Sequence, residues 1–564
     1  MAVFMNMKTL KQLLNNYISI ICSGIIGGAL FIYIYGARVI NPLYTDWLMG
    51  GGDPTQHYLG FLLYKEAPCR FQAGMMNTAA YPFSTSVMFT DSIPLAAITG
   101  KIIGLFTDTT FQYFGLWCFV SMILMGVLSC ILLRKYTDRI FVLLPASALF
   151  CLAPAMLRRI FWHTSLSSHF LLLFCLIIVS YRRDIFNTTK RTVLAWVLVS
   201  FLCIMIHMYF LAMCGMLLLL YVLLEITDMH YANKAGEVSR EDKTDLIKRL
   251  IFSVIGYVAT ALITLWWLGG FSSGMMSDAP GLSYYSFNLN SFFSPQGYST
   301  ILPELSCYKD GQYEGFAYLG VGCILLLIIG LVIAMIGSKK FNTQPMYIVS
   351  AAIVFTAIII MAASNELTFS DRLLVSVPLP GSVVKIWEIF RATGRLIWPA
   401  VYMLMLLGTV LVINGTNHRV AAVILTICLV LQVVDLGGII EAKNNEFNRE
   451  VKYSNKLDNP MMESMLIENA LEHIVFLDKQ NLSQEELYSF ARFAADNGLT
   501  INDFYFARAL TSPVNDAAMD FFMHPNNHSL YVVSAESAEL MYMFDIDFME
   551  YEGLFLGLKR TESE

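Results

Sequence analysis

Charged residues are scarce in this sequence. Only 14% of its 564 residues are Asp, Glu, Lys or Arg, whereas an average soluble domain has roughly 25%. At the same time, 56% of the residues are hydrophobic and 13% are aromatic. A soluble fold has no means of covering so much apolar surface. The composition therefore excludes a soluble protein and predicts an integral membrane protein.

Blocks of like charge are also missing. The formal net charge is -6, and the chain contains no long basic run and no acidic tail. Proteins that bind nucleic acids carry basic patches, because they neutralise phosphates with Lys and Arg. We therefore expect no nucleic-acid partner.

Cysteines outside apolar stretches are few. Nine of the eleven lie in apolar runs, where a free cysteine behaves as a small hydrophobic residue. Only Cys69 and Cys307 fall in expected loops. An oxidising exterior allows these two to pair, but the sequence does not show whether their Cα atoms come within bonding reach.

Apolar stretches long enough to cross a bilayer dominate the rest of the chain. No small-residue cleavage site follows the first of them, so we predict an uncleaved span rather than a signal peptide. The segment 94–106 is too short to cross, and we expect it at the outer surface or as a re-entrant segment. About eleven spans are expected, near residues 17–35, 111–133, 140–157, 166–181, 192–206, 209–225, 250–269, 316–337, 346–363, 396–413 and 419–437.

Basic residues predict the orientation, because cytoplasmic loops retain Lys and Arg. They cluster at Arg134, Lys135 and Arg139, at Arg182, Arg183, Lys190 and Arg191, between Lys234 and Arg249, at Lys339 and Lys340, and at Arg419. With these loops inside, the protein is a multi-pass plasma-membrane protein with a cytoplasmic N-terminus and an extracytoplasmic C-terminus. Residues 1–439 then form the transmembrane domain, and its three long outer loops, 37–110, 270–315 and 364–395, are expected to carry the function.

The composition changes near residue 440, and residues 440–564 are charged and soluble in character. HIVFLD, LTINDFYFA, LYVVSAE and EYEGLFLGL alternate with helical segments. One helix is predicted by a capping box at Ser483 and Glu486 and ends near Gly498, and a second is expected near 513–523. This alternation predicts a small extracytoplasmic α/β domain. We find in it no metal-ligand spacing, phosphate loop or nucleophile motif.

Asp53 is the first candidate for chemistry, because a carboxylate just beyond the first span can deprotonate a hydroxyl held at the membrane surface. The alternative is structural: Pro54 follows directly, so Asp53 is also suited to cap a helix. Asp46 is a second catalytic candidate, separated from Asp53 by a run of glycines. His57 lies one helical turn after Asp53, which allows the two to cooperate in binding substrate; the alternative is an ordinary surface imidazole.

Asp91, in FTDSIP, is another acid at the mouth of an expected helix. Capping is again the structural alternative. Two acids in one outer loop also suit a sugar hydroxyl or a divalent cation, so Asp91 is a candidate substrate-binding residue and a possible metal ligand.

Arg391 and Arg395 lie four residues apart at the outer start of a span, on the face where the positive-inside rule predicts fewer cations. Guanidinium groups there favour a phosphate or pyrophosphate, unless the two simply reach ordinary lipid head groups. Arg158 and Arg159, before His163, repeat the pattern more weakly.

The second outer loop combines aromatic rings with polar side chains. Glu314 follows Tyr313 there, in GQYEGFAYLG, and Gln296 lies in SFFSPQG. Rings with interspersed amides and carboxylates are typical of carbohydrate binding, although a belt of interfacial aromatic residues has a similar composition. Glu314 is therefore a candidate substrate-binding residue.

Five segments carry a resemblance: GDPTQHYLG, YPFSTSVMFTDSIPL, SFFSPQG, GQYEGFAYLG and FRATGR. They look like a bacterial family of polytopic membrane proteins of unassigned function, which in architecture resembles the GT-C superfamily of lipid-dependent glycosyltransferases. The resemblance implies an all-α polytopic fold and a transferase that uses a polyprenyl-phosphate sugar, with its base in the first outer loop. Asp53 matches that position best and Asp46 next. The chain lacks adjacent acids in that loop and a DxD in the next, which puts metal dependence in doubt.

Two functions follow as hypotheses. In the first, a glycosyltransferase moves a sugar from a polyprenyl-phosphate carrier to a cell-envelope glycan or lipid acceptor, with no cofactor other than a possible divalent cation. In the second, a transporter or flippase moves a lipid-linked or small polar substrate. Transporters bury ionisable residues in the middle of spans. Here His207 is the main such candidate.

Overall fold

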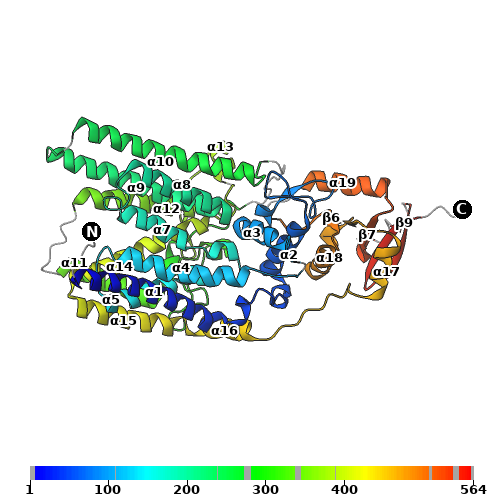
Figure 1. Ribbon diagram of the computed structural model, residues 1–564, viewed down its shortest axis with the longest axis horizontal. Coiled ribbons are helices and arrows are strands. Elements are labelled where there is room, and N and C mark those ends of the chain that lie inside the picture. Colours follow the sequence, from blue (N-terminus) through cyan, green and yellow to red (C-terminus); the bar gives the residue numbers. More distant parts are fainter. Residues whose placement is uncertain are drawn as a thin grey trace, which may run out of the picture.

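The computed structural model describes residues 7–107, 109–237, 239–271, 281–336, 344–387, 389–506, 511–537 and 545–560. Parts of the expected second and third outer loops, 272–280 and 388, lie outside these residues, as do Lys339 and Lys340. The described chain forms a long helical bundle with a smaller sheet domain at one end (Figure 1).

The bundle is built from apolar helices that run along its length (Figure 1). Each is rich in Leu, Ile, Val and Met, whose apolar side chains suit contact with lipid. The helical form satisfies the backbone groups within each segment. The bundle helices are α1 (Met7–Tyr35), α4 (Phe114–Leu133), α5 (Ile140–Cys151), α7 (Phe170–Ser180), α8 (Thr189–Ile206), α9 (Tyr209–Lys234), α10 (Arg240–Trp267), α11 (Val321–Ile336), α12 (Pro345–Ala363), α14 (Trp398–Gly415) and α15 (His418–Asp435), with the short α6 (Pro154–Leu157) and α16 (Gly437–Asn448) at their ends.

Eight stretches of the described chain are long and apolar enough to cross a membrane. The chain is therefore a multi-pass membrane protein, as predicted. The other three expected spans are shorter helices, Ile140–Cys151, Thr164–Ser180 and Val321–Ile336. The first of them ends well before the expected residue 157, because the chain extends at Ala153 and Pro154 begins a separate helix.

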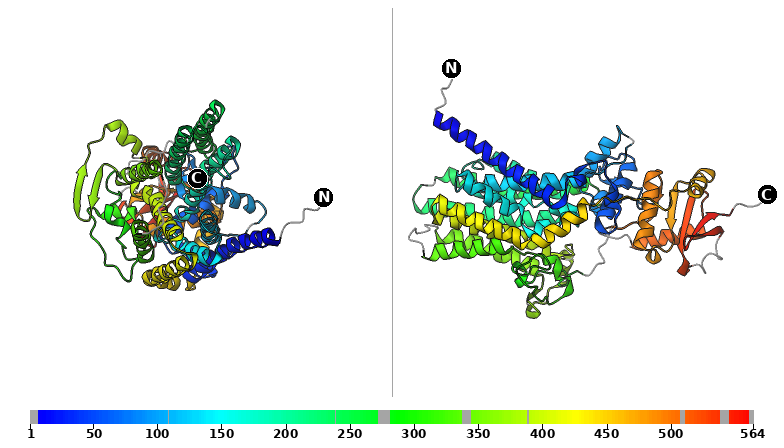
Figure 2. Two further views of the ribbon diagram at one scale, coloured as in Figure 1. Left: turned by 90° about the vertical axis from the view of Figure 1, so that its left-hand side faces the viewer. Right: turned by 90° about the horizontal axis from the view of Figure 1, so that it is seen from below.

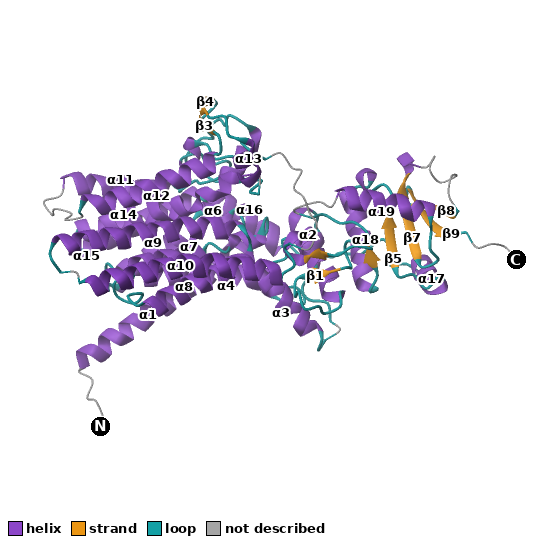
Figure 3. Ribbon diagram, turned by 90° about the horizontal axis from the view of Figure 1, so that it is seen from above, coloured by secondary structure: helices purple, strands orange, loops and turns teal. Residues whose placement is uncertain are grey.

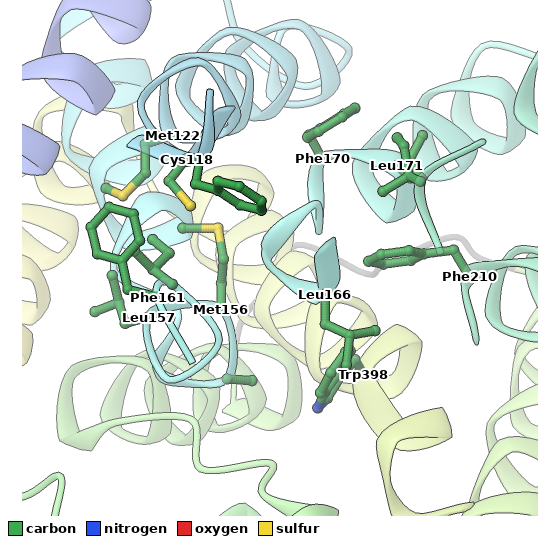
Figure 4. Close-up of a cluster of buried hydrophobic side chains, with 14 of the residues drawn as sticks. Cys118, Met122, Met156, Leu157, Phe161, Leu166, Phe170, Leu171, Phe210 and Trp398 are labelled. Atoms are coloured by element: carbon green, nitrogen blue, oxygen red, sulfur yellow. The ribbon is translucent and has the colours of Figure 1, made fainter. Parts of the chain in front are cut away.

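Glycines allow α1 and α4 to approach closely. A Cβ on Gly27 would lie 2.2 Å from the Met122 carbonyl oxygen, and one on Gly126 would lie 2.1 Å from that of Ser23. Small residues let membrane helices pack backbone to backbone, where van der Waals contact replaces the hydrophobic effect. Beside this crossing, side chains from α4, α6, α7, α9 and α14 form a packed core that includes Cys118, Met156, Phe170, Phe210 and Trp398 (Figure 4).

Gly126→Ala is expected to destabilise the bundle by about 1–3 kcal/mol, the usual cost of overpacking. The new methyl group would overlap the backbone of α1 at Ser23, and backbone cannot move aside as a side-chain end can. Thermal unfolding in detergent measures the effect. Gly437→Ala is the matched control, since nothing lies within 4 Å of a Cβ there. Equal melting temperatures for the two variants would contradict the close α1–α4 contact.

The C-terminal domain is an α/β unit (Figure 3). Its five-stranded sheet has the order β6-β5-β7-β9-β8, with β5 parallel to β6 and β7 and the other pairs antiparallel. The expected capping box at Ser483 and Glu486 is confirmed, and Gly498 follows the helix at a φ of 69°. The elements are α17 (Pro460–Glu468), β5 (His473–Phe476), α18 (Gln484–Asp496), β6 (Thr500–Ile501), α19 (Thr511–Met523), β7 (Ser529–Ser534), β8 (Ile546–Tyr551) and β9 (Leu554–Lys559).

The first long loop forms a layer between the bundle and the C-terminal domain (Figures 1 and 3). It contains α2 (Gly52–Glu66), β1 (Met75–Met76), β2 (Thr85–Ser86) and α3 (Pro94–Gly104). Backbone hydrogen bonds join it to the sheet edge, from Tyr81 to Ile501 and from Ile501 to Thr78. The third loop lies beside the bundle as a hairpin, β3 (Glu366–Phe369) and β4 (Arg372–Ser376), followed by α13 (Gly381–Trp387) (Figure 2).

Candidate functional site

A cavity of about 460 Å³ opens where the bundle meets the first loop. It brings together six of the side chains singled out from the sequence in three separate loops, together with one residue of the C-terminal domain, Phe506. One part of the lining is apolar and includes Met88, Ile204, Ile206, Ile389 and Phe390. The polar lining includes Asp53, Gln56, His57, Asp91, His163, His207, Glu314, Arg391 and Arg395.

Asp53 lies in the first turn of α2 and points into the cavity rather than capping the helix. The capping residue is Gly51, and no side chain caps this end. Asp53 Oδ2 instead lies 3.4 Å from Nε2 of His163. Burial raises the pKa of Asp53 from 3.8 to about 6, and the charge of Asp91 adds to this while that of Arg395 opposes it. A carboxylate with a pKa near neutrality is suited to act as a general base.

Asp91 does not cap a helix either. It has a φ of 56° after a short 3-10 helix, and α3 begins beyond it without a side-chain cap. Asp91 Oδ1 lies 3.3 Å from Nε2 of His207. Because Nδ1 of His207 accepts the Tyr209 N–H, the ring proton is on Nε2 and faces the carboxylate. Burial alone would raise the pKa of Asp91, but the hydrogen bond from His207 holds it well below its usual range.

His207 does not lie in the middle of a span. It occupies the turn between the end of α8 and the start of α9, and it lines the cavity. Its extended backbone breaks the helix there. The expectation of a midmembrane histidine was therefore wrong, although the expected break between the spans 192–206 and 209–225 is found at this residue.

His57 is a buried imidazole rather than a surface one, with an exposed fraction of 1%. Its Nδ1 has no hydrogen-bond partner among the described residues. Burial lowers the pKa of His57 to about 4, so the ring is neutral near pH 7. A buried polar atom without a partner calls for an explanation, and a hydroxyl of a bound substrate would supply one.

Glu314 and Arg395 form a buried network with Arg159. Arg395 donates to both carboxylate oxygens of Glu314, at 2.9 and 2.7 Å, and Arg159 donates to Oε2 at 2.6 Å. Burial alone would raise the pKa of Glu314, but the two guanidinium charges hold it well below its usual range. The carboxylate of Glu314 therefore fixes the arginines, and the network keeps a net positive charge.

The base candidate and the arginines are close in space. Arg395 Nη2 lies 3.3 Å from the same Nε2 of His163 that approaches Asp53. Asp53 and Arg395 are therefore nearer to each other than the length of a sugar phosphate, on the order of 10 Å. Burial and the charges of Arg395 and Arg159 lower the pKa of His163 well below its usual value, so the imidazole between them is neutral.

Arg391 is the exposed guanidinium of the cavity. It donates to the Tyr285 hydroxyl at 3.3 Å and lies 5.1 Å from the centre of that ring. No ion-pair partner for it is found among the described residues. The wall beside it is aromatic, with the rings of Trp162 and Tyr313 stacked at 6.2 Å.

Asp46 is not brought into the site. It begins a 3-10 helix, Asp46–Met49, and is absent from the described lining of the cavity, because the Gly50–Gly52 turn separates it from α2. Cys69 and Cys307 are both free thiols in the structure.

Sequence reasoning missed the role of His163 and Arg159 as partners of the candidate residues. The signal was present but weak: RRIFWH is a polar interruption between two expected spans. Nothing in the spacing indicated that it meets Asp53 and Glu314, which are far away in the chain. Phe506 was missed for the same reason, since only the fold brings the C-terminal domain to the cavity. Gln56 was also missed, although it lies on the helix that carries Asp53.

The donor set does not fit a metal ion. Across the described ranges, no group of three or more His, Cys, Asp and Glu side chains is placed to hold one. The carboxylates of Asp53 and Asp91 each face an imidazole instead. Asp91 is therefore unsupported as a metal ligand, and no step proposed below uses a metal.

The raised pKa of Asp53 predicts a pH-dependent stability difference. An acid whose pKa is higher in the folded than in the unfolded state stabilises the folded protein at pH values below its pKa in the unfolded state. This contribution is lost as the pH rises through its pKa in the folded state. Asp53→Asn should therefore melt like the wild type near pH 4, gain relative stability up to about pH 6, and keep a constant advantage above it. Thermal unfolding of both proteins between these pH values measures the difference. A difference that is independent of pH would contradict the raised pKa.

Comparison with solved structures finds likenesses of low identity. The oligosaccharyltransferase of Archaeoglobus fulgidus, tethered with an acceptor peptide, has a TM-score of 0.44 and 11% identity over 96% of this chain and 74% of that one. Its apo form has a TM-score of 0.44 and 12% identity over 91% and 69% of the two chains. A complex with zinc and sulfate has a TM-score of 0.42 and 12% identity over 95% and 73%.

Family models match both parts of the chain. A model described as a domain of unknown function, DUF6311, matches residues 24–437, and the DUF6311 C-terminal domain matches residues 464–559. No curated protein matches the chain in sequence. The expectation of a membrane-protein family of unassigned function is confirmed, and the chain belongs to the DUF6311 family.

Proposed function

We propose that this protein is a glycosyltransferase of the GT-C type, which moves a sugar from a polyprenyl-phosphate carrier to a cell-envelope glycan or lipid acceptor. One observation carries the proposal: Asp53, with a pKa near 6, shares a cavity with the guanidinium groups of Arg391 and Arg395. A base and an anion site within one substrate length are what transfer from a sugar phosphate to a hydroxyl requires.

Asp53 is the general base of this reaction. Its carboxylate takes the proton of the acceptor hydroxyl, the oxygen attacks the anomeric carbon, and the bond from that carbon to the phosphate oxygen breaks. The electron pair leaves with the phosphate. His163 orients the carboxylate, and the neutral ring of His57 binds a hydroxyl of the sugar or of the acceptor through its unpartnered Nδ1.

The phosphate binds beside Arg391 and Arg395 in this proposal. Negative charge grows on the leaving phosphate in the transition state, and fixed guanidinium groups stabilise it in a partly desolvated cavity. Arg391 donates directly, while Arg395, held by Glu314, contributes its charge from behind. The apolar lining at Ile204, Ile389 and Phe390 suits the first units of the polyprenyl chain.

The end of the bundle at which the cavity lies supports an extracytoplasmic reaction. Basic residues lie at the start of α8 and the end of α9, whereas the cavity is at the end of α8 and the start of α9. Positive charge is retained on the cytoplasmic side. The cavity and the C-terminal domain are therefore placed outside the cell in this proposal, with the N-terminus in the cytoplasm.

Arg391→Ala is expected to weaken binding of undecaprenyl phosphate about tenfold to a hundredfold, because a hydrogen bond to a charged group contributes about 1.5–3 kcal/mol. Titration of the purified protein in detergent with undecaprenyl phosphate measures the affinity. Arg372→Ala, which removes an exposed arginine from the hairpin, is the matched control and should bind as the wild type does. Equal affinities for all three proteins would overturn the phosphate site.

The alternative hypothesis, a transporter or flippase, predicts movement of a lipid-linked substrate without a new glycosidic bond. Its main support in the sequence, a midmembrane His207, is lost because that residue lies in the cavity wall. Measurements on the wild-type protein and the arginine variants in liposomes distinguish the two functions. A transferase changes the acceptor chemically, whereas a flippase moves the lipid across the bilayer unchanged.

A further inference from the structure

The C-terminal domain contacts the catalytic turn directly. Tyr488 donates its hydroxyl hydrogen to the Gly52 carbonyl oxygen at 3.1 Å, and the Gly52 N–H donates to Oε1 of Gln484 at 3.3 Å. Both backbone groups of the residue that precedes Asp53 are therefore bound to one helix of another domain. Nearby, Nε2 of Gln56 donates to the Tyr505 carbonyl oxygen at 3.3 Å.

The sequence of α18 places these groups on one face. Gln484, Tyr488 and Arg492 follow at intervals of four residues, which lie one above the other on a helix. This face runs along α2: the first two residues meet Gly52, and the Arg492 guanidinium lies 6.0 Å from the Tyr58 ring centre. Helix α18 thus packs lengthwise on the helix that carries Asp53.

The turn before Asp53 needs an external partner. Gly51 and Gly52 have φ values of 95° and 67°, which only glycine adopts easily, and glycine is the residue with the greatest conformational freedom. From the inside, Oγ1 of Thr55 accepts the Gly51 N–H and donates to the Leu48 carbonyl oxygen. From the outside, α18 supplies the bonds to Gly52.

We infer that helix α18 positions the catalytic carboxylate, with Tyr488 and Gln484 as positioning residues that fix Gly52 and thereby the direction of Asp53. This inference rests on the proposed role of Asp53 as the base. In this inference the domain of residues 440–564 contributes no catalytic group, but it holds in place the turn that bears the base.

Charged and titratable groups surround Asp53 on every packed element. Asp91 and Glu314 raise its pKa, Arg395 and Arg159 lower it, and His163 faces its carboxylate. From the C-terminal domain, Tyr488 of α18 faces the same turn. Burial raises the pKa of Tyr488, and the charge of Asp53 raises it to a smaller degree. Loosening the turn would let water reach Asp53, so its pKa would fall toward that of an exposed aspartate.

The test compares melting temperatures of protein pairs that differ only at Asp53. For the wild type and Asp53→Asn, the difference should grow to about pH 6 and then level off. The same comparison is made in proteins that also carry Tyr488→Phe or Gln484→Ala. There we expect the difference in melting temperature caused by Asp53→Asn to level off about one pH unit lower and to be smaller. Tyr551→Phe is the control, because that hydroxyl donates within the same domain, to the Lys456 carbonyl oxygen, and is not bound to Gly52.

The inference would be overturned if Tyr488→Phe and Gln484→Ala left unchanged the pH at which the difference in melting temperature becomes constant. Gln484 is exposed, so this variant still folds if the tyrosine variant does not. Hydrogen exchange of residues 50–56 gives a second readout that does not depend on titration: we expect faster exchange in both variants, and unchanged exchange also contradicts the inference. Failure of the base role is distinguishable, because Asp53→Asn would then keep transferase activity while these measurements stayed as expected.

Discussion

Asp53→Asn is expected to lower sugar transfer by about 10²- to 10⁴-fold, the usual contribution of a positioned general base. Asparagine has nearly the same size and can still face His163, but it does not accept a proton from a hydroxyl. Its fold should be intact, since the carboxylate caps no helix and its ionisation is disfavoured by burial. Transfer is measured as radiolabel passing from an undecaprenyl-phosphate-linked hexose to acceptor in isolated membranes.

Asp46→Asn is the matched control for this measurement. It makes the same substitution in the same loop, at a residue outside the cavity lining, and should transfer as the wild type does. Wild-type activity should also fall below about pH 6 as Asp53 takes up a proton. If Asp53→Asn retained full transfer, the base would have to be sought at Asp91.

Glu314→Gln is expected to destabilise the protein by about 3–5 kcal/mol, the usual effect of removing one partner from a buried ion pair. The variant leaves the guanidinium groups of Arg159 and Arg395 buried side by side, without the carboxylate that joins them. Their mutual repulsion should also displace Arg395 from the cavity wall. Thermal unfolding in detergent measures the loss, and titration with undecaprenyl phosphate measures the change in the cavity.

Glu225→Gln provides the comparison. Glu225 is also buried and pairs with Arg249 at the other end of the bundle, so the variant should be destabilised without a change in affinity for undecaprenyl phosphate. If Glu314→Gln melted at the wild-type temperature, the network would not be the support of the cavity that its geometry indicates.

Much of the fold follows from local patterns. Apolar runs of sufficient length predict membrane helices whatever their neighbours are, because the backbone must be satisfied within each helix. The helix after Ser483 was predictable for a similar reason, since its capping box is a local signal. The end of α5 was not, because the chain extends at Ala153 and Pro154 begins a separate helix inside the apolar stretch 140–157 that was expected to form one span.

The candidate site was predictable only in part. Asp53, Asp91 and Arg391 stand out because polar residues at the ends of spans are conspicuous against an apolar chain. Their partners are not conspicuous: His163 reaches Asp53, and His207 reaches Asp91, across long stretches of sequence. The hydrogen bond from Tyr488 to Gly52 joins two domains, and no residue spacing in either domain predicted it.

The most direct test of the proposed site is a cryo-electron microscopy structure of the full chain with undecaprenyl phosphate. We expect density for the phosphate beside Arg391, in the cavity that contains Asp53, and density for the chain leaving past Ile389 and Phe390. Phosphate density away from this cavity, or a lipid chain bound elsewhere with the cavity unchanged, would contradict the assignment of Asp53 and Arg391 to one substrate.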